Sequence, residues 1–129
     1  SIRIVEDGAA VNYFGANRFG QYLGEIPTGN LRCMSVDMGS VKEEEFTKGP
    51  YLEIISMSGL QVDSYNDYIG GEVRLAYYHD GEKTLPVTGV SISGKLSQVL
   101  ETVRLSGETA VYGGYTGPAK AALQDMTIF

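Results

Sequence analysis

This chain of 129 residues contains 17 glycines and 9 tyrosines but no tryptophan. Glycine supplies the backbone conformations that tight turns need and weakens the interior of helices, whereas tyrosine favours strands. The sequence therefore predicts many turns joined by β-strands. The length is about that of one domain, and we expect about two-thirds of the surface of the unfolded chain to be buried around a single core.

Composition excludes several classes of protein. Hydrophobic residues make up 43% and charged residues 20% of the chain, which excludes general disorder. No stretch approaches the roughly 18 apolar residues of a membrane helix. The formal charge of −6 gives no attraction to nucleic acid or acidic lipid, so we expect neither as a direct partner. One cysteine and one histidine can make neither an internal disulfide nor a complete zinc site.

The clearest strand signals lie in the second half. Residues 51–57 form a β-prone run, and residues 72–79 alternate, with Val73 on one face and Ala76 on the other. Asp80-Gly81 and the apolar run 84–92 then complete a hairpin signature, in which Pro86 favours an edge strand or a bulge. Two further strands are expected, at 31–38 and 119–129, and residues 2–6 form a short apolar run closed by the turn signal Asp7-Gly8.

Two helices are predicted. Apolar residues at i, i+3, i+4 and i+7 indicate an amphipathic helix over about 95–105, and its face Leu96, Val99, Leu100 and Val103 should pack on the 72–92 hairpin. A short helix over about 41–46 is expected after Ser40 as N-cap, with acidic residues in its first turn. A single helical turn is expected at 17–22. Residues 61–70 and 111–117 are predicted to be loops.

Hairpins with segregated helices predict an α+β, β-rich fold with antiparallel sheets. We find no linker or repeat, so residues 1–129 are expected to form a single domain. The chain begins at Ser1 with neither an initiator methionine nor a signal-peptide pattern, and we expect it to be the C-terminal domain or a fragment of a longer protein.

No self-contained catalytic motif is present, so neither catalytic nor metal-binding residues are predicted. The sequence lacks a phosphate-binding loop, a dinucleotide-binding motif, HExxH and GxSxG. His79 is expected to be an exposed turn residue, and Cys33 a buried apolar residue. The carboxylates and the amide of the 61–70 loop are as typical of residues that form hydrogen bonds within a turn as of residues that bind a ligand. Candidates for lining a substrate groove are nevertheless Asp63, Asn66, Asp67, Tyr77, Tyr78, Tyr112 and Tyr115.

Four segments together carry a family resemblance. They are the strand–Asp–turn–Gly run Val62–Gly71, the run Pro86–Leu100, the closing run Pro118–Ile128 and, upstream, Tyr22–Asn30. Their order and spacing resemble the C-terminal domain of the TldD/PmbA family, once described as modulators of DNA gyrase and now as metallopeptidases. The resemblance covers nearly the whole chain.

The resemblance implies zinc chemistry, but not within these residues. Active members have an HExxxH helix, which lies N-terminal to this region, and a cysteine ligand before the last strand. The matching stretch 111–115 reads Val-Tyr-Gly-Gly-Tyr and has no cysteine. This departure indicates the PmbA-like, metal-free half of the family, with zinc only in an active homologous half.

The leading hypothesis is a non-catalytic part of a cytoplasmic peptide-processing assembly, which shapes a substrate groove and pairs with a second subunit. A peptide would add to a strand edge, and a homo- or heterodimer with a family member would form through the sheet, around 51–57 and 72–78. The alternative is an assembly or binding module with no proteolytic activity. A stand-alone hydrolase using Cys33 or His79 is a third hypothesis.

Overall fold

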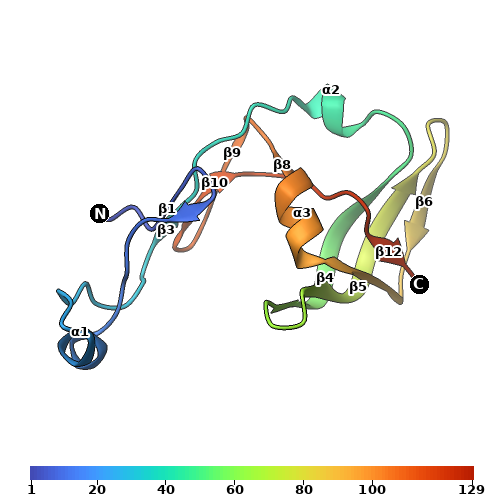
Figure 1. The fold of residues 1–129 in the computed structure, drawn as a ribbon. Coiled ribbons are helices and arrows are strands. Elements are labelled where there is room, and N and C mark those ends of the chain that lie inside the picture. The colour runs from blue at the N-terminus through green and yellow to red at the C-terminus, as the bar shows by residue number, and fades with distance from the viewer.

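The structure, a computed structural model, describes residues 1–129 and is α+β and β-rich, as the sequence predicts. Three short helices accompany two hairpin-containing sheets and two smaller strand pairs. None of these helices has the length and apolar character that crossing a bilayer requires. Figure 1 shows a sheet-containing body at one end of the molecule and an extended N-terminal segment at the other.

The largest sheet has five antiparallel strands in the order β12-β7-β5-β4, with β6 also paired to β5. The strands are β4 (Tyr51–Asp63), β5 (Tyr68–His79), β6 (Thr84–Val87), β7 (Val90–Lys95) and β12 (Thr127–Ile128). Strand β4 has a neighbour on one side only, and its pairing with β5 shifts register between Ile54 and Gly59. Edge strands commonly carry such bulges.

The predicted hairpin is confirmed, with two differences. Asp80 accepts a hydrogen bond from the backbone N–H of Lys83 in the turn, and Pro86 lies in β6, which pairs only with β5. The return run is divided at Gly89, whose φ of 67° breaks the strand into β6 and β7. The predicted loop 61–70 was too long, because its two ends extend β4 and β5 and leave only 64–67 as a turn.

The core is small. Val73, Ala76 and Ile92 form its buried cluster. Ala76 is therefore buried although the sequence pattern places it on the strand face that carries charged residues. Half-buried residues surround the cluster: Leu52, Met57, Val87, Val90 and Met126.

Helix α3 (Leu96–Thr102) confirms the amphipathic helix but ends earlier than predicted. Val99 is buried at 3% exposure. The expectation that Leu100 packs inward was wrong, because its side chain is 65% exposed. The chain leaves the helix at Val103 to form β8 (Arg104–Leu105), and this exit shortens the apolar face.

Helix α2 (Glu43–Phe46) lies where the short helix was predicted, with three acidic residues in its first turn. Its N-cap residue is Lys42, without a side-chain cap, so the prediction of Ser40 was wrong.

The C-terminal quarter is more broken than predicted. Residues 111–117, predicted as a loop, belong to a hairpin of β9 (Thr109–Tyr112) and β10 (Tyr115–Pro118), which turns at Gly113. The single strand predicted at 119–129 is instead β11 (Ala121–Ala122), paired with β8, and β12, with Asp125 at positive φ between them.

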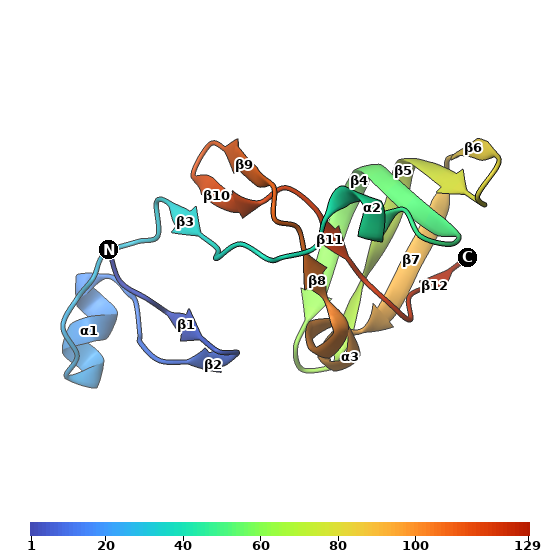
Figure 2. The same cartoon turned by 90° about the horizontal axis from the view of Figure 1, so that it is seen from above.

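We call residues 1–38 the arm. It contains β1 (Val5–Glu6), β2 (Ala9–Ala10), α1 (Asn17–Leu23) and β3 (Met34–Ser35). Strand β3 pairs in parallel with β10 and is shorter than the predicted 31–38, and β1 lies at the end of the apolar run 2–6. Figures 1 and 2 both place α1 and the β1-β2 hairpin away from the five-stranded sheet, which we call the body together with α3.

Candidate functional site

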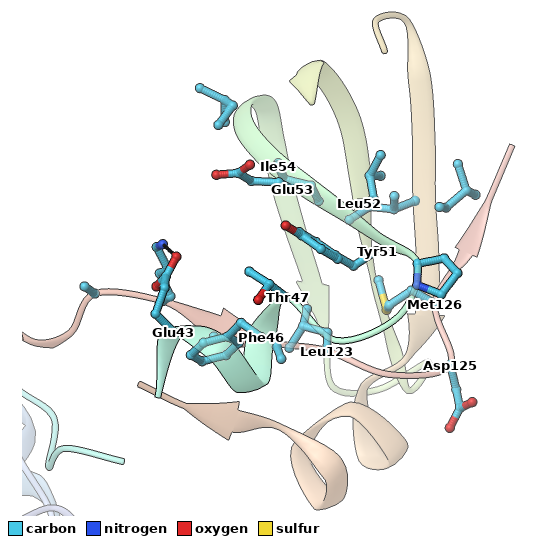
Figure 3. A pocket seen from close by; sticks show the side chains of 18 residues that line it. Glu43, Phe46, Thr47, Tyr51, Leu52, Glu53, Ile54, Leu123, Asp125 and Met126 are labelled. Atoms are coloured by element: carbon cyan, nitrogen blue, oxygen red, sulfur yellow. Dashed lines mark hydrogen bonds and ion pairs between the residues drawn. The ribbon is translucent and has the colours of Figure 1, made fainter. Parts of the chain in front are cut away.

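The main hollow of the body is a groove of about 720 Å³ between β4, α2 and the chain segment 119–128 (Figure 3). Twelve of its 18 lining residues are hydrophobic, so its wall is apolar. Phe46 of α2 and Leu123 lie on one side of it, and Leu52 and Met126 lie toward the core.

The groove follows the free edge of β4. Five consecutive residues, 51–55, line it, although side chains of a strand point alternately to opposite faces. The backbone of β4 is therefore exposed to the groove along with its side chains. Within this stretch Ile54 and Ile55 are 38% and 52% exposed. An edge strand beside an apolar hollow offers both hydrogen-bonding groups and side-chain pockets.

Charged groups stand at one side of the groove. Lys120 Nζ lies 2.6 Å from Glu43 Oε1, in an ion pair whose side chains are both about half exposed. This hydrogen bond is the largest cause that raises the pKa of Lys120. Burial, the second cause, lowers it, and the charges of Glu43, Glu108 and Glu53 raise it further. The lining contains Glu43, Glu53 and Asp125 against the single cation Lys120, so the groove is acidic overall.

His79 is held at the start of β4, and the expectation of an exposed turn residue was wrong. It ends β5 opposite Tyr51, and the two rings stack with centroids 4.5 Å apart. Its Nε2 lies 2.9 Å from Glu53 Oε2 and its Nδ1 lies 3.1 Å from Thr84 Oγ1. Its side chain is 23% exposed. These contacts fix Glu53, a residue that lines the groove.

The comparison with known families decides the identity. The description of the matching family is "PmbA/TldA metallopeptidase C-terminal domain", and the match covers residues 1–129. The chain belongs to this family. The resemblance to the C-terminal domain of the TldD/PmbA family is thereby confirmed. No curated protein and no solved structure matches the chain.

A metallopeptidase family implies zinc, but the side chains of this PmbA/TldA-type domain do not fit a zinc ion. No three His, Cys, Asp or Glu side chains gather in one place. Cys33 directly precedes β3 in the arm, whereas His79 ends β5 in the body. Cys33 is also exposed, so the expectation of a buried cysteine was wrong. A tetrahedral zinc site needs three or four such ligands together.

The three polar groove candidates lie in and beside the β4-β5 turn, where they stabilise the fold. Asp63 accepts hydrogen bonds from the backbone N–H groups of Tyr65 and Asn66 and from the Asn66 side chain. Asp67 accepts from the backbone N–H and hydroxyl of Ser97 in the first turns of α3. These bonds lower the pKa of both carboxyls, with the Asn66 and Ser97 side chains as the largest causes. None of the three residues lines the apolar groove.

The tyrosine candidates are divided between two sheets. Tyr77 and Tyr78 lie in β5, whereas Tyr112 and Tyr115 are register partners in the β9-β10 hairpin. The Tyr115 hydroxyl donates to the Pro118 carbonyl. The structure therefore does not bring the four together around one hollow, and contact with substrate stays a prediction for each.

Sequence reasoning named the strand around 51–57 as a contact surface, but it missed the other residues that line the groove and gave Glu53 no role. Glu53 interrupts the apolar run Tyr51-Leu52-Glu53-Ile54-Ile55, and an acidic residue inside a β-prone run is a signal that could have been used. Glu43, Leu123 and Lys120 carry no such local signal, because only the tertiary fold brings them to β4.

Proposed function

We propose that this domain is the non-catalytic, peptide-holding and subunit-pairing part of a metallopeptidase-type assembly. An extended peptide adds to the free edge of β4 and places side chains in the adjoining groove. The observation that carries the proposal is the coincidence of an unpaired strand edge with the apolar groove at residues 51–55. Peptide hydrolysis then takes place at a zinc ion held by a homologous subunit, in the cytoplasm.

The shape of β4 limits where a peptide pairs. Tyr51–Ile54 keeps regular register with β5, while the stretch from Ile54 to Gly59 is irregular. Bulges disturb the hydrogen-bonding row of an edge and so discourage strand addition. The regular stretch is the one beside the groove, which makes it the pairing site. Alternate side chains of the peptide then face the apolar wall formed by residues such as Leu123 and Met126.

Charge gives the groove a preference. With three carboxylates against one lysine in its lining, it favours apolar peptides that carry basic rather than acidic side chains. Glu53 is fixed by His79, so its carboxylate is oriented before a peptide arrives.

The test is a titration of the protein with a fluorescent, extended apolar peptide containing one lysine. Ile54→Lys should weaken binding about tenfold or more, because it places a charge on the pairing edge and removes apolar wall. Val62→Lys is the matched control, since Val62 is exposed on the same strand outside the groove. Equal affinities for wild type and Ile54→Lys would refute the peptide site.

The alternative, a binding module with no proteolytic activity, shares this surface. The two functions can be distinguished by measuring peptide cleavage in a mixture of this protein, a zinc-bearing family member and a peptide. Faster cleavage that Ile54→Lys removes supports the peptide-processing function, whereas unchanged cleavage with intact peptide binding supports the module.

A further inference from the structure

Glu53 is the one charged residue in the stretch of β4 that is free to pair with a peptide. It lies between Leu52 and Ile54, where the register of β4 with β5 is regular. Its side chain is 43% exposed and lines the groove (Figure 3). A strand added to this edge therefore passes directly in front of a carboxylate.

The alternation of a β-strand decides which residue of a bound peptide meets Glu53. Directly opposed residues of an antiparallel pair share a face, with Cβ atoms about 4.5–5.5 Å apart, and opposite charges attract each other there. The residues before and after them face the other way. On β4 those neighbours are Leu52, which packs against the core cluster, and Ile54. The peptide that fits this edge therefore has one basic residue between two apolar ones.

One oxygen of the Glu53 carboxylate has no partner. Its Oε2 lies 2.9 Å from His79 Nε2, and this is the only hydrogen bond or ion pair that the side chain makes. The lysine of the groove, Lys120, is paired with Glu43 instead. Each oxygen of a carboxylate accepts hydrogen bonds. The free Oε1 of Glu53 can therefore receive the ammonium or guanidinium group of a peptide side chain.

The ring of His79 fits its surroundings in both of its charge states. Because an ionised carboxylate only accepts hydrogen bonds, Nε2 carries a hydrogen atom and donates to Glu53. Nδ1 lies 3.1 Å from Thr84 Oγ1, and a hydroxyl group can donate to a neutral ring or accept from a protonated one. The stack with Tyr51, whose ring plane is 12° from that of His79, holds the ring in place. His79 can therefore gain a proton without moving.

The charge of His79 changes the net charge that a peptide meets. With a neutral ring, the His79–Glu53 pair has one net negative charge, whereas with a protonated ring it has none. Histidine ordinarily changes its charge between about pH 5 and 8, and carboxyl, phenol and ammonium groups ordinarily do so outside this range. The groups of those other kinds on the neighbouring elements are Tyr51, Tyr77, Asp80, Glu82 and Lys83, and in the groove lining Glu43, Lys120 and Asp125.

We propose that Glu53 selects peptides with a basic residue opposite it and an apolar residue on either side, and that His79 ends this selection when its ring gains a proton. Glu53 is the specificity-determining residue, and His79 is a positioning residue that acts through Glu53. The proposal rests on the peptide-binding part of the proposed function, and it names the substrate class and the regulation of that site.

Titrations of the full chain with two fluorescent peptides test the proposal. The central valine–lysine–valine of one peptide is replaced by valine–norleucine–valine in the other, so the two differ by one charge. At about pH 8 the lysine peptide should bind about three- to fivefold more tightly than the norleucine peptide. At about pH 5.5 the two affinities should converge. Circular dichroism at both pH values checks that the protein is folded.

Variants assign the effect to the two side chains. Glu53→Gln should abolish the preference for lysine at both pH values, because it removes the charge and keeps the shape. His79→Gln, whose amide nitrogen can still donate to Glu53, should keep the preference at both pH values, whereas His79→Ala should reduce it. The matched control is Glu82→Gln, which removes an exposed carboxylate outside the groove and should behave as wild type.

The possible failures are distinguishable. If the wild type binds neither peptide, the proposed function is wrong, and so is this inference. If the wild type binds both peptides equally at about pH 8, or if the preference survives Glu53→Gln, the groove still binds peptide but Glu53 does not select the basic residue. If the wild type keeps its preference at about pH 5.5, His79 does not control the selection.

Discussion

The body and the arm differ in how far they bury their apolar side chains. In the body, β4 and β5 pair over a long ladder, and their side chains close around Val73, Ala76 and Ile92. In the arm, most hydrogen bonds join segments of the arm itself, as between the two-residue strands β1 and β2, and only β3 pairs with a distant strand, while the apolar side chains stay in solvent. Backbone hydrogen bonding gives the arm its shape, but burial gives the body its stability. Of the two regions, only the body buries a cluster of apolar side chains.

The largest effect should come from the core of the body. Ile92→Ala should reduce the free energy of unfolding by about 2–5 kcal/mol, because Ile92 is 4% exposed and its removal leaves a cavity. Ile26→Ala in the arm should cost less than about 0.5 kcal/mol in the monomer, since Ile26 is 87% exposed. Urea melts at low protein concentration measure both. Similar losses for the two variants would remove the distinction between body and arm.

The next effect separates two neighbours on α3. Val99→Ala should cost about 1.5–3 kcal/mol, the value of a fully buried aliphatic side chain. Leu100→Ala should cost less than about 0.5 kcal/mol, because most of that side chain is in solvent. The same melts test the pair, and a reversed order would mean that the helix presents its other face to the sheet.

A smaller effect is expected where the arm meets the body. A Cβ on Gly39 would collide with the carbonyl of Leu105, so Gly39→Ala should cost about 1–3 kcal/mol through overpacking. Gly15→Ala is the matched control inside the arm, because its Cβ would meet only Phe19 at an ordinary distance. Limited proteolysis around residues 36–42 should become faster in Gly39→Ala alone. Unchanged cleavage would show that the junction tolerates a methyl group.

The smallest effect depends on pH and concerns the turn that joins β4, β5 and α3. Hydrogen bonds from Ser97 hold the pKa of Asp67 below its usual range, so ionised Asp67 stabilises the folded state. That stabilisation is complete above the unfolded pKa of about 3.9 and is lost as pH falls through the lower folded pKa. Asp67→Asn should therefore be less stable than wild type at pH 6, and the difference should shrink toward pH 2. A constant difference would show that charge is not the cause.

Local sequence signals predicted what local chemistry determines. Asp80-Gly81 marked the hairpin, and the spacing of Leu96 and Val99 marked α3. They failed where distant segments decide the outcome. The exposure of Leu100 follows from the way α3 packs, which buries Val99, and the position of His79 follows from the pairing of β4 with β5.

The groove was the least predictable feature. Its walls come from β4, α2 and the segment 119–128, so no single window of sequence contains it. The loop candidates Asp63, Asn66 and Asp67 were recognisable as polar, but their partner Ser97 lies some 30 residues away. Without that contact, a ligand-binding carboxylate and a structural one look the same in a sequence.

The parallel pairing of β3 with β10 has a consequence for the order of events during synthesis. Met34 and Ser35 pair with Tyr115 and Thr116, so the arm cannot be anchored until almost all of the chain has left the ribosome. Contacts so distant in sequence form late in folding. Until then a stretch that carries half of the exposed large hydrophobic residues is synthesised but not fixed, and aggregation competes with folding in that interval.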